Sequence, residues 1–242
     1  MDQPLLNQVA LVTGSSKRLG REVALGLAKH GADIVIHYRS SEDDARKAAA
    51  EVEKLGRRAI TLKADLEDIS QIRALFEKTA AQFGRLDILV NSAASFVQTE
   101  FAKTTEKDWS ESLDTNVKAP FFCSQAAAPL LKKTNGCIIN FADVGGILGW
   151  TGYIPHSISK AGVVMLTKCL AKELAPEVRV NAIAPGTITM PDDAPEIEAN
   201  FIKQAPLKRS GRPPDIVQAV VYLATAKFVT GHTLVVDGGR VL

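Results

Sequence analysis

The sequence predicts an α/β fold: a single-domain, doubly wound parallel sheet with helices on both faces. Apolar runs of strand length alternate with amphipathic helical patterns over the whole chain of 242 residues, and this alternation is typical of parallel sheets with right-handed crossovers. The run at 86–90 is apolar apart from Asp87, as expected for a strand covered on both faces. A glycine-containing turn joins the first apolar run directly to a helix. We therefore expect residues 1–242 to form one domain.

The first elements form a strand–helix–strand unit. The strand at 9–12 leads into a helix that contains 22–28 and whose basic last turn ends at Gly31. The strand at 33–38 follows, with alternating apolar and β-branched residues. This unit is the standard start of a doubly wound sheet.

The remaining elements continue the alternation. Helix 45–55 carries apolar residues at helical spacing and ends at Gly56, and helix 69–83 ends at Gly84 in the same way. The other expected elements, in order, are strand 59–64, strand 86–90, helix 106–132, strand 137–141, helix 158–174, strand 178–183, helix 214–225 and strand 233–236.

The turn after the first strand is the predicted phosphate seat. Gly14 permits the sharp turn, and Gly20, which has no Cβ, permits the helix to pack close to the strand and to a cofactor. The first N–H groups of a helix have no partner within it, so they and the helix dipole attract an anion. The residues expected to bind the cofactor here are Gly14, Ser16, Lys17, Arg18, Leu19 and Gly20.

Cations stand in this phosphate seat and directly after the next strand. Lys17 and Arg18 stand at a helix N-terminus, where the dipole disfavours positive charge, and a bound anion would explain them. Arg39 follows the strand at 33–38, where an NAD-selective site usually has an acidic residue, and a guanidinium there suits a ribose 2′-phosphate. We therefore expect NADP(H). The alternative is that all three are solvated surface cations.

Chain-wide composition favours a small-molecule partner. There are 29 Lys and Arg residues against 27 Asp and Glu, with no long basic run, which argues against nucleic acid and against a membrane surface. Cys123, Cys137 and Cys169 fit no short metal-ligand spacing, so we expect no metal site and a reducing compartment. No signal pattern or apolar run of membrane-spanning length occurs, and we expect a cytoplasmic protein.

At Asn91 the resemblance of the chain to the classical short-chain dehydrogenase/reductase family becomes clear. The motifs that carry the resemblance are Asn91-Ser92-Ala93-Ala94, Leu113-Asp114-Thr115-Asn116-Val117, Ser159-Lys160-Ala161, the run at 179–186 and the run at 230–239. The resemblance covers nearly the whole chain and implies a Rossmann fold, NADP(H) and a homotetramer. Helix 214–225 and strand 233–236 look like the tetramer interface of that family, but they could also simply close the sheet.

The resemblance implies roles for further residues. Asp65 would contact adenine, Asn91 would support the cofactor ribose region, and Asn116 would hold a water that links the active-site lysine to solvent. Asn116 falls inside the expected helix 106–132, so it could equally face solvent. The remaining cofactor contacts that we expect are Tyr38, Ser40, Leu66, Ala93, Lys160, Pro185, Gly186 and Ile188.

Within that family the chain is most similar to pteridine reductases. Arg18 before the last glycine of the turn, and the dipeptide Ser95-Phe96, carry this likeness. By resemblance Phe96 would stack a pterin against the nicotinamide; the alternative is a loop aromatic packed on the core. We expect a lid at 190–206 to determine the substrate.

The catalytic stretch departs from the family pattern. Asp143 stands where the family has serine, as in pteridine reductases, and His156 stands where it has tyrosine, four residues before Lys160. A histidine has an ordinary pKa of about 6.5, and nearby cations disfavour its charged form whereas a carboxylate favours it. We therefore expect His156 to be the proton donor, Asp143 its partner or the group that orients the substrate, and Lys160 the cation that binds the nicotinamide ribose.

Three alternatives stay open at this point. Tyr153 could replace His156 as the donor, because it precedes the helix by a few residues. The substrate could be a pteridine, or a 3-oxoacyl or other carbonyl compound. If His156 only fills space or caps the helix, the chain would be a catalytically weak NADP(H)-binding protein that acts as a sensor or a structural subunit.

Overall fold

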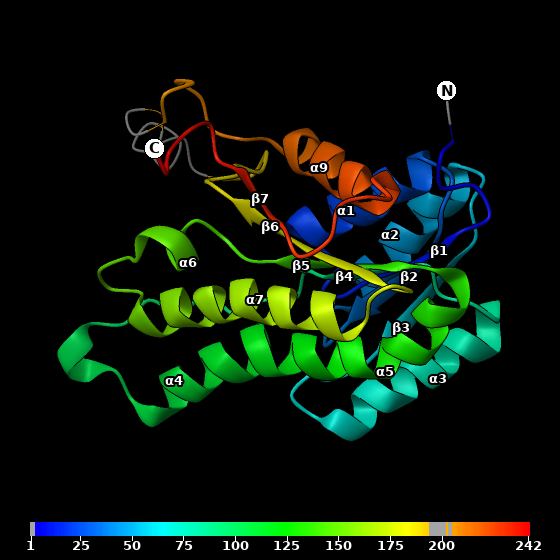
Figure 1. Ribbon diagram of the computed structural model, residues 1–242, viewed down its shortest axis with the longest axis horizontal. Coiled ribbons are helices and arrows are strands. Elements are labelled where there is room, and N and C mark those ends of the chain that lie inside the picture. The colour runs from blue at the N-terminus through cyan, green and yellow to red at the C-terminus, as the bar shows by residue number, and fades with distance from the viewer. Residues whose placement is uncertain (1–2, 194–201, 203–204) are drawn as a thin grey trace.

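The computed structural model describes residues 3–193, 202 and 205–242. Within these residues seven parallel strands form one sheet in the order β3-β2-β1-β4-β5-β6-β7, with helices on both faces (Figure 1). The strands are β1 (Val9–Val12), β2 (Asp33–Tyr38), β3 (Ala59–Lys63), β4 (Ile88–Asn91), β5 (Cys137–Phe141), β6 (Arg179–Pro185) and β7 (Thr233–Val236). The predicted fold class, a single doubly wound α/β domain, is confirmed.

Two helical layers enclose the sheet. Figure 1 shows α1, α2 and α9 on one face and α3, α4, α5 and α7 on the other. The helices are α1 (Arg18–Lys29), α2 (Glu42–Lys54), α3 (Ile69–Phe83), α4 (Glu106–Leu113), α5 (Ala119–Thr134), α6 (Gly145–Leu148), α7 (Ile154–Glu173) and α9 (Pro213–Thr225). A membrane-crossing helix, long and apolar enough for a bilayer, is absent from the described ranges.

Successive strand residues supply the cores of the two layers. On β1 the side chain of Leu11 belongs to the cluster formed with α3, α5 and α7, whereas Val12 belongs to the cluster formed with α1, α2 and α9. Every residue of β1, β4 and β5 is buried. This burial on both faces explains why these strands are almost continuously apolar.

The point where the strand order reverses lies at β1. This strand pairs with β2 on one side and with β4 on the other, so the crossovers on its two sides run in opposite directions. The loops after β1 and β4 therefore diverge to opposite faces and leave a crevice at the carboxyl ends of the strands.

The largest differences from the sequence expectation concern two helices. The expected helix 106–132 is divided into α4 and α5 by a π-helical turn, Asp114–Lys118, and α5 continues to Thr134. A π turn contains one extra residue, which periodicity in the sequence does not reveal. The helix expected at 158–174 begins earlier, at Ile154, because Pro155 favours the first turn of a helix, and His156 therefore lies within α7.

His37 ties the end of β2 to the turn after β1. Its Nδ1 accepts a hydrogen bond from the Gly14 N–H (2.9 Å), so the ring proton is on Nε2, which donates to the Ala64 carbonyl (3.1 Å). The Ser15 hydroxyl oxygen accepts the His37 backbone N–H (3.1 Å). Desolvation by burial lowers the pKa of His37 to about 4, only partly opposed by its bond to Ala64 and by the charge of Asp65.

Helix α1 packs against α9 at a glycine. A Cβ on Gly26 would overlap both γ-methyl groups of Val217. Ala in place of Gly normally stabilises a helix interior by about 1 kcal/mol, but overpacking against a stiff β-branched neighbour costs about 1–3 kcal/mol. We expect Gly26→Ala to lower the free energy of unfolding in urea by about 1–2 kcal/mol. Val217→Ala in the same chain should recover most of this loss; an additive double mutant would contradict the contact.

Burial of neutral His37 makes stability depend on pH. The unfolded chain binds a proton at this side chain near pH 6.5, whereas the folded chain does so only near pH 4. The contribution is therefore complete above about pH 6.5 and is lost as the pH falls towards 4, by about 3 kcal/mol in total. We expect His37→Asn, which keeps an acceptor for Gly14, to flatten the free energy of unfolding between pH 6.5 and 4. An unchanged slope would show that other groups cause it.

Candidate active site

A cleft of about 1000 Å³ lies at the carboxyl ends of the strands. Its lining includes most of the predicted cofactor residues: Gly14, Ser16, Lys17, Arg18, Leu19, Gly20, Tyr38, Arg39, Asp65, Leu66, Ala93, Lys160 and Pro185. Phe96 lines it as well, and His37 is a lining residue that the sequence analysis did not assign. Ser40, Asn91, Gly186 and Ile188 lie outside the lining. The topology thus brings together residues at the carboxyl ends of β1 to β6 and Lys160 of α7.

Both glycines of the turn are required sterically. Gly14 has φ +65°, and a Cβ there would be 3.0 Å from the Ala93 Cα. A Cβ on Gly20 would lie 2.5 Å from the carbonyl oxygen of Gly14. The start of α1 therefore approaches the turn closely enough for its free N–H groups to face the cleft.

The three predicted phosphate-binding cations each face a carboxylate. Lys17 lies 2.9 Å from Asp44, and Arg18 lies 2.9 Å from Asp193. Arg39 Nη1 is 3.8 Å from Glu67. All three cationic side chains are more than half exposed. Surface pairs of this kind contribute little free energy, so they leave the cations free to bind a phosphate at small cost.

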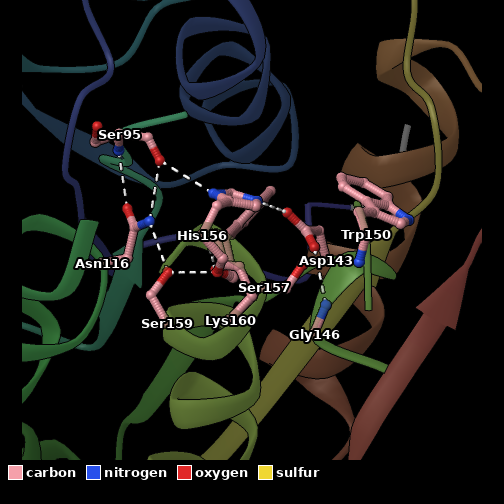
Figure 2. A network of polar contacts seen from close by, with 10 residues as sticks. Ser95, Asn116, Asp143, Gly146, Trp150, His156, Ser157, Ser159 and Lys160 are labelled. Atoms are coloured by element: carbon pink, nitrogen blue, oxygen red, sulfur yellow. Dashed lines mark hydrogen bonds and ion pairs between the residues drawn. The ribbon is translucent and has the colours of Figure 1, made fainter. Parts of the chain in front are cut away.

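Asp143 and His156 form a short hydrogen-bonded pair beside the cleft. His156 Nε2 lies 2.6 Å from Asp143 Oδ2, and Nδ1 lies 3.3 Å from the Ser95 carbonyl oxygen (Figure 2). The His156 side chain is 2% exposed. Neither residue lines the cleft itself, but Ala142 and Lys160, their neighbours in the loop and on α7, do.

The charge state of Asp143 follows from its surroundings. Burial raises the pKa of the carboxyl, but the hydrogen bond from His156 and the charge of Lys160 outweigh it and hold the pKa below its ordinary value. Asp143 Oδ1 also accepts the Gly146 N–H (3.2 Å). A Cβ on Gly146 would lie 2.6 Å from the backbone of Lys160, so this glycine lets the Asp143 loop approach α7.

Lys160 is buried and points back to the sheet. Its Nζ donates to the Phe141 carbonyl oxygen (2.8 Å). Desolvation lowers the pKa of the ammonium group, and the negative charge of Asp143 raises it in part. Lys160 therefore both lines the cleft and interacts electrostatically with Asp143.

Asn116 is buried and does not face solvent, so that alternative is wrong. Its Nδ2 donates to the Ser95 carbonyl and to Ser159 Oγ, both at 2.9 Å, while Oδ1 accepts the Ser95 N–H (2.8 Å) (Figure 2). Ser159 Oγ in turn donates to the His156 carbonyl (2.7 Å). The π turn at Asp114–Lys118 carries Asn116 into this network, which holds both the Ser95 loop and the start of α7.

Aromatic rings surround His156. Phe96 meets it edge to face (4.7 Å between centroids), and Trp150 lies nearly parallel to it (6.2 Å, 13°). Phe96 is 59% exposed and lines the cleft, so it is not packed in the core. Tyr153, at the N-cap of α7, stacks on Phe96 (4.8 Å). The contact between the Trp150 ring and the His156 ring was not predicted, because no local pattern connects these two residues.

Of the predicted lid at 190–206, residues 194–201 and 203–204 lie outside the described part of the chain. Its first residues are fixed: Asp193 Oδ2 accepts the Met190 N–H (2.8 Å) while Oδ1 pairs with Arg18. The beginning of this segment is therefore linked directly to the glycine turn.

Comparisons with known proteins agree with this architecture. A sequence profile of the family described as "Enoyl-(Acyl carrier protein) reductase" matches residues 14–240. A 3-oxoacyl-(acyl-carrier-protein) reductase of Staphylococcus aureus is 37% identical, covering 97% of this chain and 98% of the relative. A 3beta-hydroxysteroid dehydrogenase of Eggerthella lenta is also 37% identical, over 100% of this chain and 97% of its own length.

A solved structure has a similar fold. The blue fluorescent protein from a metagenomic library, crystallised in complex with NADPH, superposes with a TM-score of 0.92 at 33% identity, covering 98% of this chain and 99% of its own. The parallel sheet, the glycine turn and the matches over almost the full length lead to one conclusion. The chain belongs to the classical short-chain dehydrogenase/reductase family of oxidoreductases.

Proposed function

We propose that this chain is an NADPH-dependent reductase that adds hydride and a proton to a C=O or C=N group, with the His156–Asp143 pair as the proton donor. The observation that carries the proposal is the 2.6 Å contact between His156 Nε2 and Asp143 Oδ2, next to buried Lys160 at the inner end of the cleft. Charged groups placed in this way favour proton transfer at a defined point.

The residues of the cleft fit NADP(H). A Cβ at Gly14 or Gly20 would fill the cradle at the start of α1, and such a cradle with a helix N-terminus accepts a pyrophosphate. Arg39 and Arg18 suit the additional phosphate of NADP(H). Asp65 and Leu66, which line the cleft as Arg39 does, would contact adenine, and Lys160 and Pro185, which also line it, would contact the nicotinamide side. When bound, the cofactor supplies the hydride.

Each ring nitrogen of His156 faces a hydrogen-bond acceptor. Nε2 of His156 faces the Asp143 carboxylate and Nδ1 faces the Ser95 carbonyl, so the doubly protonated ring satisfies both contacts. Ionised Asp143 supports that charge, and the proton then belongs to the pair and to neither side chain alone. Lys160 holds the nicotinamide ribose, and Asn116 fixes Ser95 and Ser159 around the donor.

A pteridine-type substrate is the first choice. Phe96 offers an exposed ring at the cleft, suited to a planar heterocycle, and Arg18 and Asp143 complete the likeness to pteridine reductases. A 3-oxoacyl or other carbonyl substrate is the second choice, supported by the reductase and dehydrogenase named among the relatives. Tyr153, stacked on Phe96, is the alternative donor.

The same proposal includes a cytoplasmic homo-oligomer, a tetramer by resemblance, and a substrate lid at 190–206. Exposed apolar side chains on the outer helices, Trp109, Phe121 and Met165, support self-association. A contrasting possibility is a catalytically weak NADP(H)-binding protein, sensor or structural subunit. The near-complete burial of His156 under Phe96 and Trp150 is the observation that favours it.

NADPH oxidation against dihydrobiopterin, dihydrofolate and activated ketones between about pH 5 and 8 tests the donor. We expect the rate to rise as the pH falls, because the donor must be protonated. His156→Ala should lower kcat by about 10²–10⁴-fold, whereas His156→Tyr should keep activity with an altered pH profile. If wild type is inert at every pH and His156→Tyr gains turnover, the binding-protein alternative is correct. Retained activity in His156→Ala that is lost in Tyr153→Phe assigns the donor to Tyr153.

Cofactor selectivity tests Arg39. We expect Arg39→Asp to lower kcat/KM for NADPH by about 10- to 100-fold, because charge-assisted hydrogen bonds contribute about 1.5–3 kcal/mol each, and to shift preference towards NADH. Arg46→Asp is the matched control: Arg46 is an exposed α2 residue that pairs with Glu42 and does not line the cleft. Equal NADPH preference in the two variants would remove Arg39 from the 2′-phosphate site.

A further inference from the structure

We propose that Trp150 and Arg240 are positioning residues for His156: Arg240, from the segment after β7, holds the indole ring, and the indole ring holds the imidazole against Asp143. The inference rests on the proposed function, since it assigns a purpose to the orientation of His156. It extends the active site to a part of the chain that no motif connects with the chemistry.

The contacts form a continuous series. The Arg240 guanidinium carbon lies 5.3 Å from the centroid of the Trp150 ring, within the range of a cation–π interaction. The Trp150 ring is nearly parallel to the His156 ring, at 13° (Figure 2). His156 then reaches Asp143 at 2.6 Å. Three packed contacts thus connect the C-terminal segment to the ion pair.

The orientation of the indole depends on packing. Its Nε1–H is buried and has no hydrogen-bond acceptor in the described ranges. The backbone N–H of Trp150 donates to Ser157 Oγ (3.1 Å), which fixes the main chain but not the ring. Gly145 makes room for the ring, since a Cβ there would be 2.9 Å from Trp150 Cε3. Arg240 is the charged group that contacts the ring.

Arg240 itself is held firmly. The Asp237 carboxylate accepts the N–H groups of Gly239 (2.7 Å) and Val241 (2.8 Å), the two residues that flank Arg240. Arg240 Nη1 also donates to Thr187 Oγ1 (3.3 Å), in the loop after β6. A side chain fixed at its backbone and at its tip can hold an aromatic ring in one orientation.

Charged and polar groups lie around His156 on several sides. Asp143 faces it directly, and Lys160 lies on the same helix and interacts with Asp143. The Ser95 carbonyl faces Nδ1, Tyr153 and the imidazole both contact Phe96, and Arg240 acts through the indole. The imidazole makes its two polar contacts at the edge of its ring. A change in the tilt of the indole would move the imidazole packed against it and would therefore change both hydrogen-bond distances.

Turnover and its pH profile provide the first test. We expect Arg240→Met to lower kcat by about tenfold, as a small misplacement of a reacting group does, to shift the pH profile, and to leave KM for NADPH within about twofold. Arg240→Lys keeps a cation and should retain most activity, and Trp150→Phe should retain more than Trp150→Leu. Arg209→Met, an exposed arginine paired with Asp215, is the matched control and should behave as wild type.

A fluorescence titration tests the same contact without turnover. The chain has two tryptophans, so Trp109→Phe leaves Trp150 as the single emitter, and a neighbouring imidazolium quenches indole emission. We expect emission to change with pH, the change to disappear in His156→Asn, and its midpoint to shift by about half a pH unit in Arg240→Met. Circular dichroism and thermal midpoints identify any variant that has lost its fold, in which case Arg240→Lys and Arg240→Gln carry the comparison.

The outcomes separate this inference from the proposed function. If wild type is inert with every substrate but the titration midpoint moves in Arg240→Met, the positioning role stands and the reductase proposal fails. If Arg240→Met turns over with the wild-type kcat and pH profile and titrates as wild type, the positioning role is wrong. A loss confined to NADPH affinity also overturns it, because Arg240 would then belong to the cofactor site.

Discussion

Burial of the parallel sheet on both faces is the constraint on which the rest of the molecule depends. Every residue of β1, β4 and β5 is buried, so polar groups can emerge only where strands end. Parallel pairing brings all the carboxyl ends to one edge, and the reversal of order at β1 opens a crevice there. The glycine turn, Arg39, Asp65 and Lys160 therefore line one cleft, although they are far apart in the chain.

Beside that cleft lie Asp143 and His156, which we propose take the place of the serine and tyrosine of the family. A serine and a tyrosine are neutral donors, whereas Asp143 is a carboxyl group hydrogen-bonded to His156, and this hydrogen bond together with the charge of Lys160 holds the pKa of Asp143 below its ordinary value. The pair is fastened from several sides: Gly146 donates to the carboxylate, and the Asn116–Ser159 network holds the backbone around the imidazole. Such a site depends on orientation, because an unpaired charge in this buried position would be costly.

Groups around the cleft are held in two ways, by exposed ion pairs and by buried hydrogen bonds. Lys17, Arg18 and Arg39 pair with carboxylates on exposed surfaces, where ion pairs contribute little. His37 and Asn116, in contrast, are buried and fully hydrogen-bonded, so they position the turn and the loop at 92–97. A ligand phosphate can thus replace the carboxylates that pair with these cations without disturbing the backbone that holds the reacting groups.

The sequence by itself determined the fold class, the glycine turn and most of the predicted cofactor residues that line the cleft, because the periods of helices and strands and the residues at their ends follow from local rules. The resemblance to the family also indicated Asp143 and His156, at the positions of its serine and tyrosine. The sequence did not indicate the π turn that buries Asn116, the hydrogen bond from Gly14 to His37, or the contacts from Arg240 through Trp150 to His156. Only the tertiary structure decided these, because they depend on side-chain packing between residues up to almost a hundred positions apart, which no local pattern records.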